Sequence, residues 1–218
     1  MADEIRPSFP VSSSPPPESA AIQSIISALD LQTHIEGGYY AETHRDALLV
    51  PSPFPETPAS ELVAQRPGFD PKQRNISTTI FYLVTPSSPQ GNFHLETSLM
   101  KSDKITKLTI TRHTLHKGRG RYVLIHADED NRIETFVVGH NVAKGEKLQW
   151  IVTGGKYKAS FLLPDQEGGD TSSEGLLISE TVVPGFEFCD HDFLSLKGLH
   201  DLLGEEKAKP LEWLVRKD

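Results

Sequence analysis

Tyr40, Glu42 and His94 are the residues whose types and spacing best suit acid–base chemistry. Tyr40 and Glu42 lie two positions apart in a β-rich run, so a strand there places both side chains on one face. His94 lies between Phe93 and Leu95 in another apolar run. An imidazole or carboxylate that accepts a proton, opposite a tyrosine that donates one, can move protons on a bound molecule. We therefore predict that His94, Glu42 and Tyr40 are the catalytic residues of one cavity.

Other side chains are expected to bind the substrate in that cavity. Phe81 and Trp150 are the aromatic residues best placed to line it, although aromatics on strands also serve as ordinary core. Glu36 either reaches the pocket or hydrogen-bonds a turn amide. His116 is a further candidate, but it lies three residues after His113, so the two point to opposite faces of a strand. At most one of these two histidines faces inward.

A metal site is the alternative use of His94. Glu96 follows two residues later, so a strand would place both side chains on one face. Imidazole and carboxylate ligands suit iron, manganese, nickel or zinc. This pair is only half of a site. We therefore expect no metal and no cofactor, and we keep a divalent metal held through His94 and Glu96 as the alternative.

Short β-rich runs must position these residues. They cover residues 39–44, 77–84, 107–111, 121–126, 133–138, 148–152, 157–163 and 176–183. Turn-forming Gly, Pro, Asn and Asp separate most of them. Runs of this length and spacing predict an all-β dominated fold, either a sandwich or a barrel.

Two peripheral helices are also expected. One covers residues 19–30, where isoleucines and a leucine recur with helical period at Ile22, Ile25, Ile26 and Leu29. The other covers residues 196–203, with Ser195 as its N-cap and Gly204 as its stop. Two segments show neither a helical nor a strand pattern. Residues 1–18 are rich in Pro and Ser and predict a disordered tail, and a Pro-rich loop or lid is expected at about residues 48–74. The rest, residues 19–218, reads as a single domain.

Composition excludes several classes of function. The 218 residues carry a formal net charge of −8, which disfavours nucleic acid as a partner. No apolar run is long enough to cross a membrane, and the first residues do not resemble a secretion signal. Cys189 is the single cysteine, so no disulfide forms within the chain. These features predict a protein of the cytoplasm.

Five segments resemble one family. They are HIEGGYYAET from His34, STTIFYLV from Ser77, NFH from Asn92, the pair of runs between Gly145 and Leu163, and VVPGFEFCDHDF from Val182. Together they resemble a branch of the cupin superfamily known as domain of unknown function 985, which has a His-Pro-Glu-Gly-Gly-Tyr signature and a Val-x-Pro-Gly-Phe-x-Phe-x-Asp-Phe signature. The resemblance implies a double-stranded β-helix, or jelly roll, with a pocket inside the barrel. It also implies a homodimer.

The sequence departs from this branch in two places. Metal-binding cupins have a histidine in a second motif, and the corresponding position here falls near Lys158, which we expect to bind substrate instead. Leu95 follows the histidine where the branch has arginine, and about ten residues are inserted between residues 95 and 112. The insertion either lengthens a hairpin at the barrel mouth or results from how the coding sequence was assembled.

The resemblance implies a function only in outline, because one cupin fold serves many reactions. The branch resembles sugar-nucleotide epimerase-type cupins, which transfer protons without a metal. We expect a small-molecule-binding cupin with isomerase or epimerase activity of that metal-independent type. One alternative is a metal-dependent cupin oxygenase or lyase. Another is a non-catalytic module that binds or stores a ligand.

Overall fold

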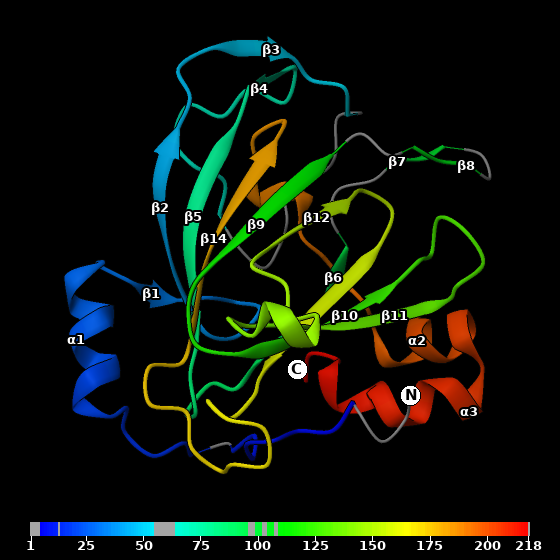
Figure 1. Cartoon of the computed structure of the whole chain (residues 1–218). Coiled ribbons are helices and arrows are strands. Elements are labelled where there is room, and N and C mark those ends of the chain that lie inside the picture. The colour runs from blue at the N-terminus through cyan, green and yellow to red at the C-terminus, as the bar shows by residue number, and fades with distance from the viewer. Residues whose placement is uncertain are drawn as a thin grey trace.

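The computed structural model describes residues 5–12, 14–54, 64–95, 99–101, 104–106 and 109–217. Two antiparallel sheets form its centre (Figure 1). The first sheet has the strand order β1 (Gln32–Thr33), β2 (Tyr39–Arg45), β5 (Thr78–Val84), β14 (Leu176–Val183), β9 (Ile110–Lys117) and β12 (Gln149–Thr153). The second has the order β11 (Ile133–Val138), β10 (Gly120–Ile125), β13 (Tyr157–Leu162), β6 (Gln90–Leu95) and β15 (Asp192–Phe193). The predicted all-β dominated jelly roll with few helices is confirmed.

Two smaller ladders extend from these sheets. β3 (Leu49–Pro51) pairs with β4 (Gln73–Asn75) at the two ends of the Pro-rich loop. β7 (Leu99–Lys101) pairs with β8 (Lys104–Thr106) inside the segment that the sequence identified as an insertion. Residues 55–63 of the loop, and residues 96–98, 102–103 and 107–108 of the insertion, lie outside the described residues.

The helices cover the outer faces of the sheets. α1 (Ala20–Ala28) starts at Ser19, whose hydroxyl accepts a hydrogen bond from the Ile22 amide at 3.3 Å, and it packs on β5 and β14. α2 (Leu196–Leu203) is capped by Ser195 and ends at Gly204. α2, α3 (Glu205–Ala208) and the 3₁₀ helix η4 (Lys209–Leu214) cover the second sheet. Figure 1 shows α1 beside β1 and β2, and α2 and α3 beside β10 and β11. The remaining 3₁₀ helices are η2 (Val142–Lys144) and η3 (Phe188–Asp190).

The core lies between the sheets and beneath the helices. Side chains of β5, β9, β12 and β14 meet those of β10 and β13 in a cluster that includes Trp150, Tyr122 and Leu162. None of the helices in the described ranges has the length and apolarity needed to cross a membrane.

The N-terminal segment differs from the predicted disordered tail where it is described. Residues 5–12 and 14–18 contain no helix or strand, but Ile5 and Phe9 are only 4% and 9% exposed. Ile5 packs in the cluster beneath α2, α3 and η4, and Phe9 packs in the cluster that includes Trp150. Glu18 accepts a hydrogen bond from the Thr85 hydroxyl. Burial of two apolar side chains favours this packed arrangement, and the Pro and Ser content gave no indication of it.

Candidate functional site

The turn between β1 and β2 carries the first two residues of the site, His34 and Glu36. Gly37 adopts φ +104°, and a side chain there would meet the Gln90 carbonyl oxygen at 2.2 Å, so the turn requires glycine. Asn92 of β6 binds the Glu36 carbonyl oxygen twice, through its backbone amide at 2.7 Å and its side-chain amide at 3.0 Å. The Gly-Gly signature therefore fixes Glu36 against the second sheet.

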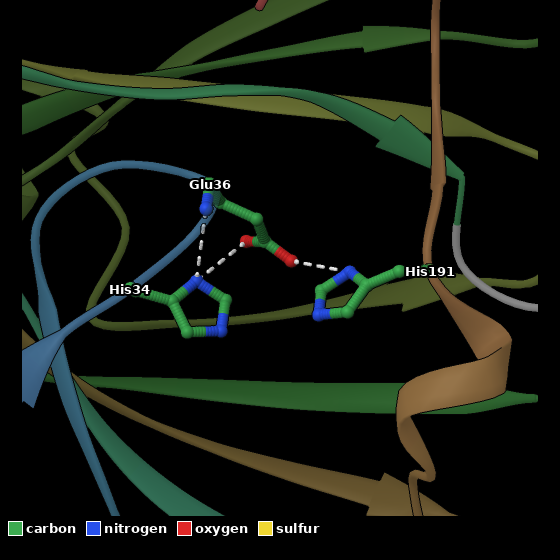
Figure 2. Close-up of side chains that lie close together, drawn as sticks. All are labelled: His34, Glu36 and His191. Carbon is green, nitrogen blue, oxygen red and sulfur yellow. Dashed lines mark hydrogen bonds and ion pairs between the residues drawn. The ribbon is translucent and has the colours of Figure 1, made fainter. Parts of the chain in front are cut away.

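The Glu36 carboxylate lies among three histidine rings. Its Oε2 is 3.7 Å from His34 Nδ1 and 3.4 Å from His94 Nδ1, and its Oε1 is 3.3 Å from His191 Nδ1. Figure 2 shows His34 and His191 on two sides of the carboxylate. The rings come from the β1–β2 turn, from β6, and from the segment between η3 and β15. Three distant parts of the chain thus meet at one acidic group.

His94 is held in a single tautomer. Its Nδ1 lies 2.9 Å from the Asn92 carbonyl oxygen, which accepts hydrogen bonds and cannot donate them, so Nδ1 carries the proton. Nε2 then has the lone pair. Burial, followed by the charge of Lys158, lowers the pKa of His94 well below its ordinary value. The neutral ring can therefore accept a proton at Nε2.

His34 is neutral as well. Burial, followed by the nearby His191 and His94, lowers its pKa to about 3. The Glu36 backbone amide donates to His34 Nδ1 at 3.3 Å, which places the lone pair at Nδ1 and the ring proton at Nε2.

A buried ion pair lies below the histidines. Lys158 of β13 donates from Nζ to Glu180 Oε2 of β14 at 2.8 Å. His113 Nε2 of β9 is 3.3 Å from Lys158 Nζ and 3.4 Å from Glu180 Oε2. Burial alone would raise the pKa of Glu180, but Lys158 and His113 together lower it well below its ordinary value. The pair places one positive and one negative group at fixed positions on the floor of the cavity.

Arg45 organises the opposite end of the site. Its guanidinium donates to both carboxylate oxygens of Glu42, at 3.0 and 2.8 Å, and to Glu187 at 2.8 Å. Arg66 from the Pro-rich loop also donates to Glu187, at 2.9 Å. The loop therefore contacts a residue that lines the site.

These groups surround one cavity of about 70 Å³. The structure brings together five of the side chains predicted from the sequence, namely Glu36, Tyr40, Glu42, His94 and Lys158. Other lining residues include Arg45, Tyr82, Glu180, Glu187 and His191, and the apolar lining comes from Ile80, Leu95, Val182, Phe186 and Phe188. The cavity is thus apolar on one side and rich in titratable groups on the other.

The structure corrects the predicted positions of Phe81 and His116. Cross-strand partners share a face, and the pairing of Ala41 with Phe81 places both on the outer face of the first sheet, against α1. His116 lies on that outer face too, with its ring 5.5 Å from Phe81. Ile80 and His113 are the inward-facing residues of these strands. Side chains alternate between the two faces of a strand, so an error of one position in choosing the inward-facing residues places a side chain on the wrong face.

Trp150 needs a different correction. It lies on the inner face of β12, but it stacks on His113 with ring centroids 5.0 Å apart and is part of the core rather than of the cavity lining. The Trp150 indole therefore supports the Lys158–Glu180–His113 group from behind.

Arg45, Glu180, Glu187 and His191 were not predicted as site residues. Glu180 is a lone carboxylate in an apolar strand, which is a usable signal for a buried functional or paired group. His191 and Glu187 lie in the C-terminal signature, which served only to recognise the family.

The metal site that the sequence suggests at His94 and Glu96 stays untested, because Glu96 lies outside the described residues. Lys158, which the resemblance places near the histidine of metal-binding cupins, is paired with Glu180 at 2.8 Å, and a protonated amine is not a metal ligand. The described residues beside His94 on β6 and β13 therefore do not supply the ligand set of a metal-dependent cupin.

A double-stranded β-helix with a polar cavity between its sheets defines the class of protein as a cupin. Residues 23–194 match the family model described as Cupin superfamily (DUF985), and the chain belongs to this family.

A curated relative and solved structures agree with this assignment. The chain is 39% identical to the Uncharacterized protein YML079W of Saccharomyces cerevisiae over 201 residues, which is 92% of this chain and 89% of that protein. A hypothetical protein from Leishmania major superimposes with a TM-score of 0.66 and 25% identity, covering 89% of this chain and 98% of that one. Protein SO0799 from Shewanella oneidensis superimposes with a TM-score of 0.63 and 21% identity, covering 90% and 98%, and shows the fold.

Proposed function

We propose that the cavity binds a small molecule and catalyses proton transfer on it, as an isomerase or epimerase does. The observation that carries this proposal is His94. It presents an unprotonated Nε2 while its Nδ1–H is held by the Asn92 carbonyl at 2.9 Å. Glu36 Oε2 lies 3.4 Å from the same Nδ1, so its negative charge would stabilise the imidazolium formed when Nε2 takes a proton.

Tyr40 supplies the acid. It lines the cavity, and burial, followed by the negative charge of Glu42, raises its pKa, so its hydroxyl stays protonated at neutral pH. In the proposed step a proton leaves a substrate carbon for His94 Nε2, and the electron pair of that C–H bond moves onto an adjacent carbonyl oxygen. Tyr40 donates a hydrogen bond to this oxygen. Return of the proton to the other face of the same carbon completes an epimerisation. If that carbon carries a hydroxyl group, transfer of the hydroxyl proton to the enolate oxygen and return of the carbon-bound proton to the neighbouring carbon complete an isomerisation. Either outcome restores His94.

The size and lining of the cavity limit the substrate. A volume of about 70 Å³ is small compared with typical sites for drug-sized ligands, which are on the order of 300 Å³ or more. Ile80, Val182 and Phe186 offer apolar contacts on one side. We therefore propose a substrate of few carbon atoms that carries a carbonyl or hydroxyl group.

Deuterium exchange tests this function whichever product is formed. Chelator-treated protein is incubated in D₂O with dihydroxyacetone, glyceraldehyde or pyruvate, and loss of the C–H signal is followed by proton NMR. We expect exchange to fall by about 10²-fold or more in His94→Asn. The matched control is His116→Asn, because His116 lies on the outer face.

Thermal melting makes this result interpretable. A histidine that serves the site should be replaceable with little loss of stability, whereas truncation of a core histidine costs about 1–3 kcal/mol in unpaired partners. Exchange that persists in a folded His94→Asn variant would refute the proton-transfer role. Binding without exchange in the wild-type protein would favour the non-catalytic binding module.

We also propose that the chain forms a homodimer in the cytoplasm. The dimer is inferred from the family resemblance, and exposed apolar side chains at the open edge of the first sheet support it. Ile110, Leu148 and Ile151 are 50%, 43% and 53% exposed on or beside β9 and β12. Light scattering at micromolar concentration should give twice the mass of the chain, and a single-chain mass would refute the dimer.

A further inference from the structure

The strongest unexplained feature of the site is the meeting of two imidazoles with one carboxylate. One ring nitrogen of His34, one Glu36 carboxylate oxygen and one ring nitrogen of His191 all lie within 4.8 Å of one another. We propose that His34, Glu36 and His191 form a binding site for one divalent transition-metal ion per chain. This inference goes beyond the proton transfer proposed above. It also departs from the metal-free expectation drawn from the sequence, which assigned none of these three residues as a ligand.

The spacing of the ligand atoms fits an ion better than it fits hydrogen bonds. Glu36 Oε2 is 3.7 Å from His34 Nδ1 and Glu36 Oε1 is 3.3 Å from His191 Nδ1, both longer than ordinary N–H···O hydrogen bonds. Neighbouring ligand atoms around a tetrahedral ion with bonds of about 2.1 Å lie about 3.4 Å apart. Each contact therefore has about the separation expected between two ligand atoms of one ion, and because the contacts involve different carboxylate oxygens, Glu36 would present both oxygens to that ion.

The chemistry of the donors also fits. The Glu36 amide fixes the lone pair of His34 at Nδ1, the atom that faces the carboxylate, and a bound ion would take over that lone pair. Two imidazoles and one carboxylate suit zinc, iron, cobalt or nickel and leave coordination positions open. An ion in this place would supply a Lewis acid for an oxygen-bearing ligand in the cavity.

Neighbouring side chains hold the His191 ring in place. It stacks on Phe193 with centroids 5.6 Å apart and an interplanar angle of 5°, and it contacts the edge of Phe186 at 4.9 Å. The preceding residue, Asp190, is anchored by the buried Arg74 at 2.9 Å. A ring fixed in this way loses little conformational freedom when it binds an ion.

A second group of ligand-type residues provides the internal comparison. His126, Asp128 and Glu129 also lie within reach of one another. In that group the Lys156 ammonium already contacts Asp128 at 3.0 Å and Glu129 at 3.4 Å. A cation is therefore already present there, and we do not propose a metal site at His126.

Cobalt(II) is the probe, because its visible absorption reports on coordination and not on turnover. Metal-free full-length protein is titrated with Co²⁺ and followed by absorption spectroscopy and calorimetry. We expect one Co²⁺ per chain, with affinity reduced about 100-fold or more in His191→Ala and in Glu36→Gln. His126→Asn is the matched control and should bind like the wild type. Circular dichroism and melting of each metal-free variant establish that it is folded.

The possible results distinguish a metal site at His34, Glu36 and His191 from its absence. If His191→Ala does not fold, Glu36→Gln decides, because glutamine keeps the size of the side chain. Failure of the wild-type protein to bind Co²⁺ at millimolar concentration would overturn the site. Binding that survives in Glu36→Gln but is lost in His126→Asn would overturn it as well. The readout involves no substrate, so this result is independent of deuterium exchange in the chelator-treated protein.

Discussion

Replacing Lys158 by methionine should destabilise the protein strongly, because it leaves Glu180 as a buried, uncompensated carboxylate. Lys158 and Glu180 are 4% and 7% exposed, and their charged atoms are 2.8 Å apart. Removing one partner of such a buried pair costs about 3–5 kcal/mol. A chain of this length loses about 2–4 °C of Tm for each kcal/mol, so Lys158→Met should lower Tm by about 6–20 °C.

The direction of the pH dependence follows from the same structure. Without Lys158, burial should raise the pKa of Glu180 above its value in the unfolded chain. A raised pKa in the folded state makes the protein more stable below the unfolded pKa and less stable as pH rises through the folded pKa. The deficit of Lys158→Met relative to the wild type should therefore be smaller at pH 5 than at pH 8.

Thermal melting and urea denaturation of four proteins test this reasoning. Lys158→Met combined with Glu180→Leu removes both charges and should recover most of the lost stability. The control is Lys144→Met, because Lys144 contacts Glu167 at the same 2.8 Å but both side chains are exposed, so no measurable change in Tm is expected. The reasoning fails if Lys158→Met costs less than about 1 kcal/mol, or if the double variant is no more stable than the single one.

Two further predictions concern tyrosines. Tyr82→Phe removes the hydrogen bond from the Tyr82 hydroxyl to the Gly37 carbonyl at 2.8 Å, and it should cost about 1–2 kcal/mol, or about 2–8 °C in thermal melting. An unchanged Tm would show that water satisfies that carbonyl. Burial, followed by the charge of Asp192, raises the pKa of Tyr157 to about 12, so its contribution to stability is complete below pH 10 and is lost between pH 10 and 12. Tyr157→Phe should unfold less steeply than the wild type in that range, and identical alkaline unfolding curves would contradict the assignment.

The sequence was sufficient where a signal is local. β-rich runs separated by turn residues located most of the strands of both sheets. Helical periodicity located α1, and capping residues located α2, which starts after Ser195 and ends at Gly204. The two-residue spacing of Tyr40 and Glu42 predicted that they share one face of a strand. In the structure they pair with Tyr82 and Ile80, and all four side chains line the cavity.

The sequence could not show which side chains of β5 point into the cavity. The run STTIFYLV is apolar on both faces, since one face lines the cavity and the other packs on α1. A strand that is covered on both sides has no alternation of apolar and polar residues to show which face points into the cavity. The prediction that Phe81 faces the cavity was therefore wrong by one residue, since Ile80 does. β9 is covered on one side only, with buried and exposed residues alternating, but its sequence ITRHTLHK carries polar side chains on both faces, so the sequence allowed either His113 or His116 to face inward.

The site itself was decided by tertiary structure. The sequence predicted Glu36 either as a substrate-binding residue or as a residue that hydrogen-bonds a turn amide, and it assigned no role to His191. Their contact, at 3.3 Å, joins positions 155 residues apart in the chain, from the β1–β2 turn to the segment after η3. No periodicity links residues on two loops, because the position of a loop depends on how the sheets pack and not on its own repeat. Only the folded barrel therefore brings His34, His94 and His191 around the Glu36 carboxylate.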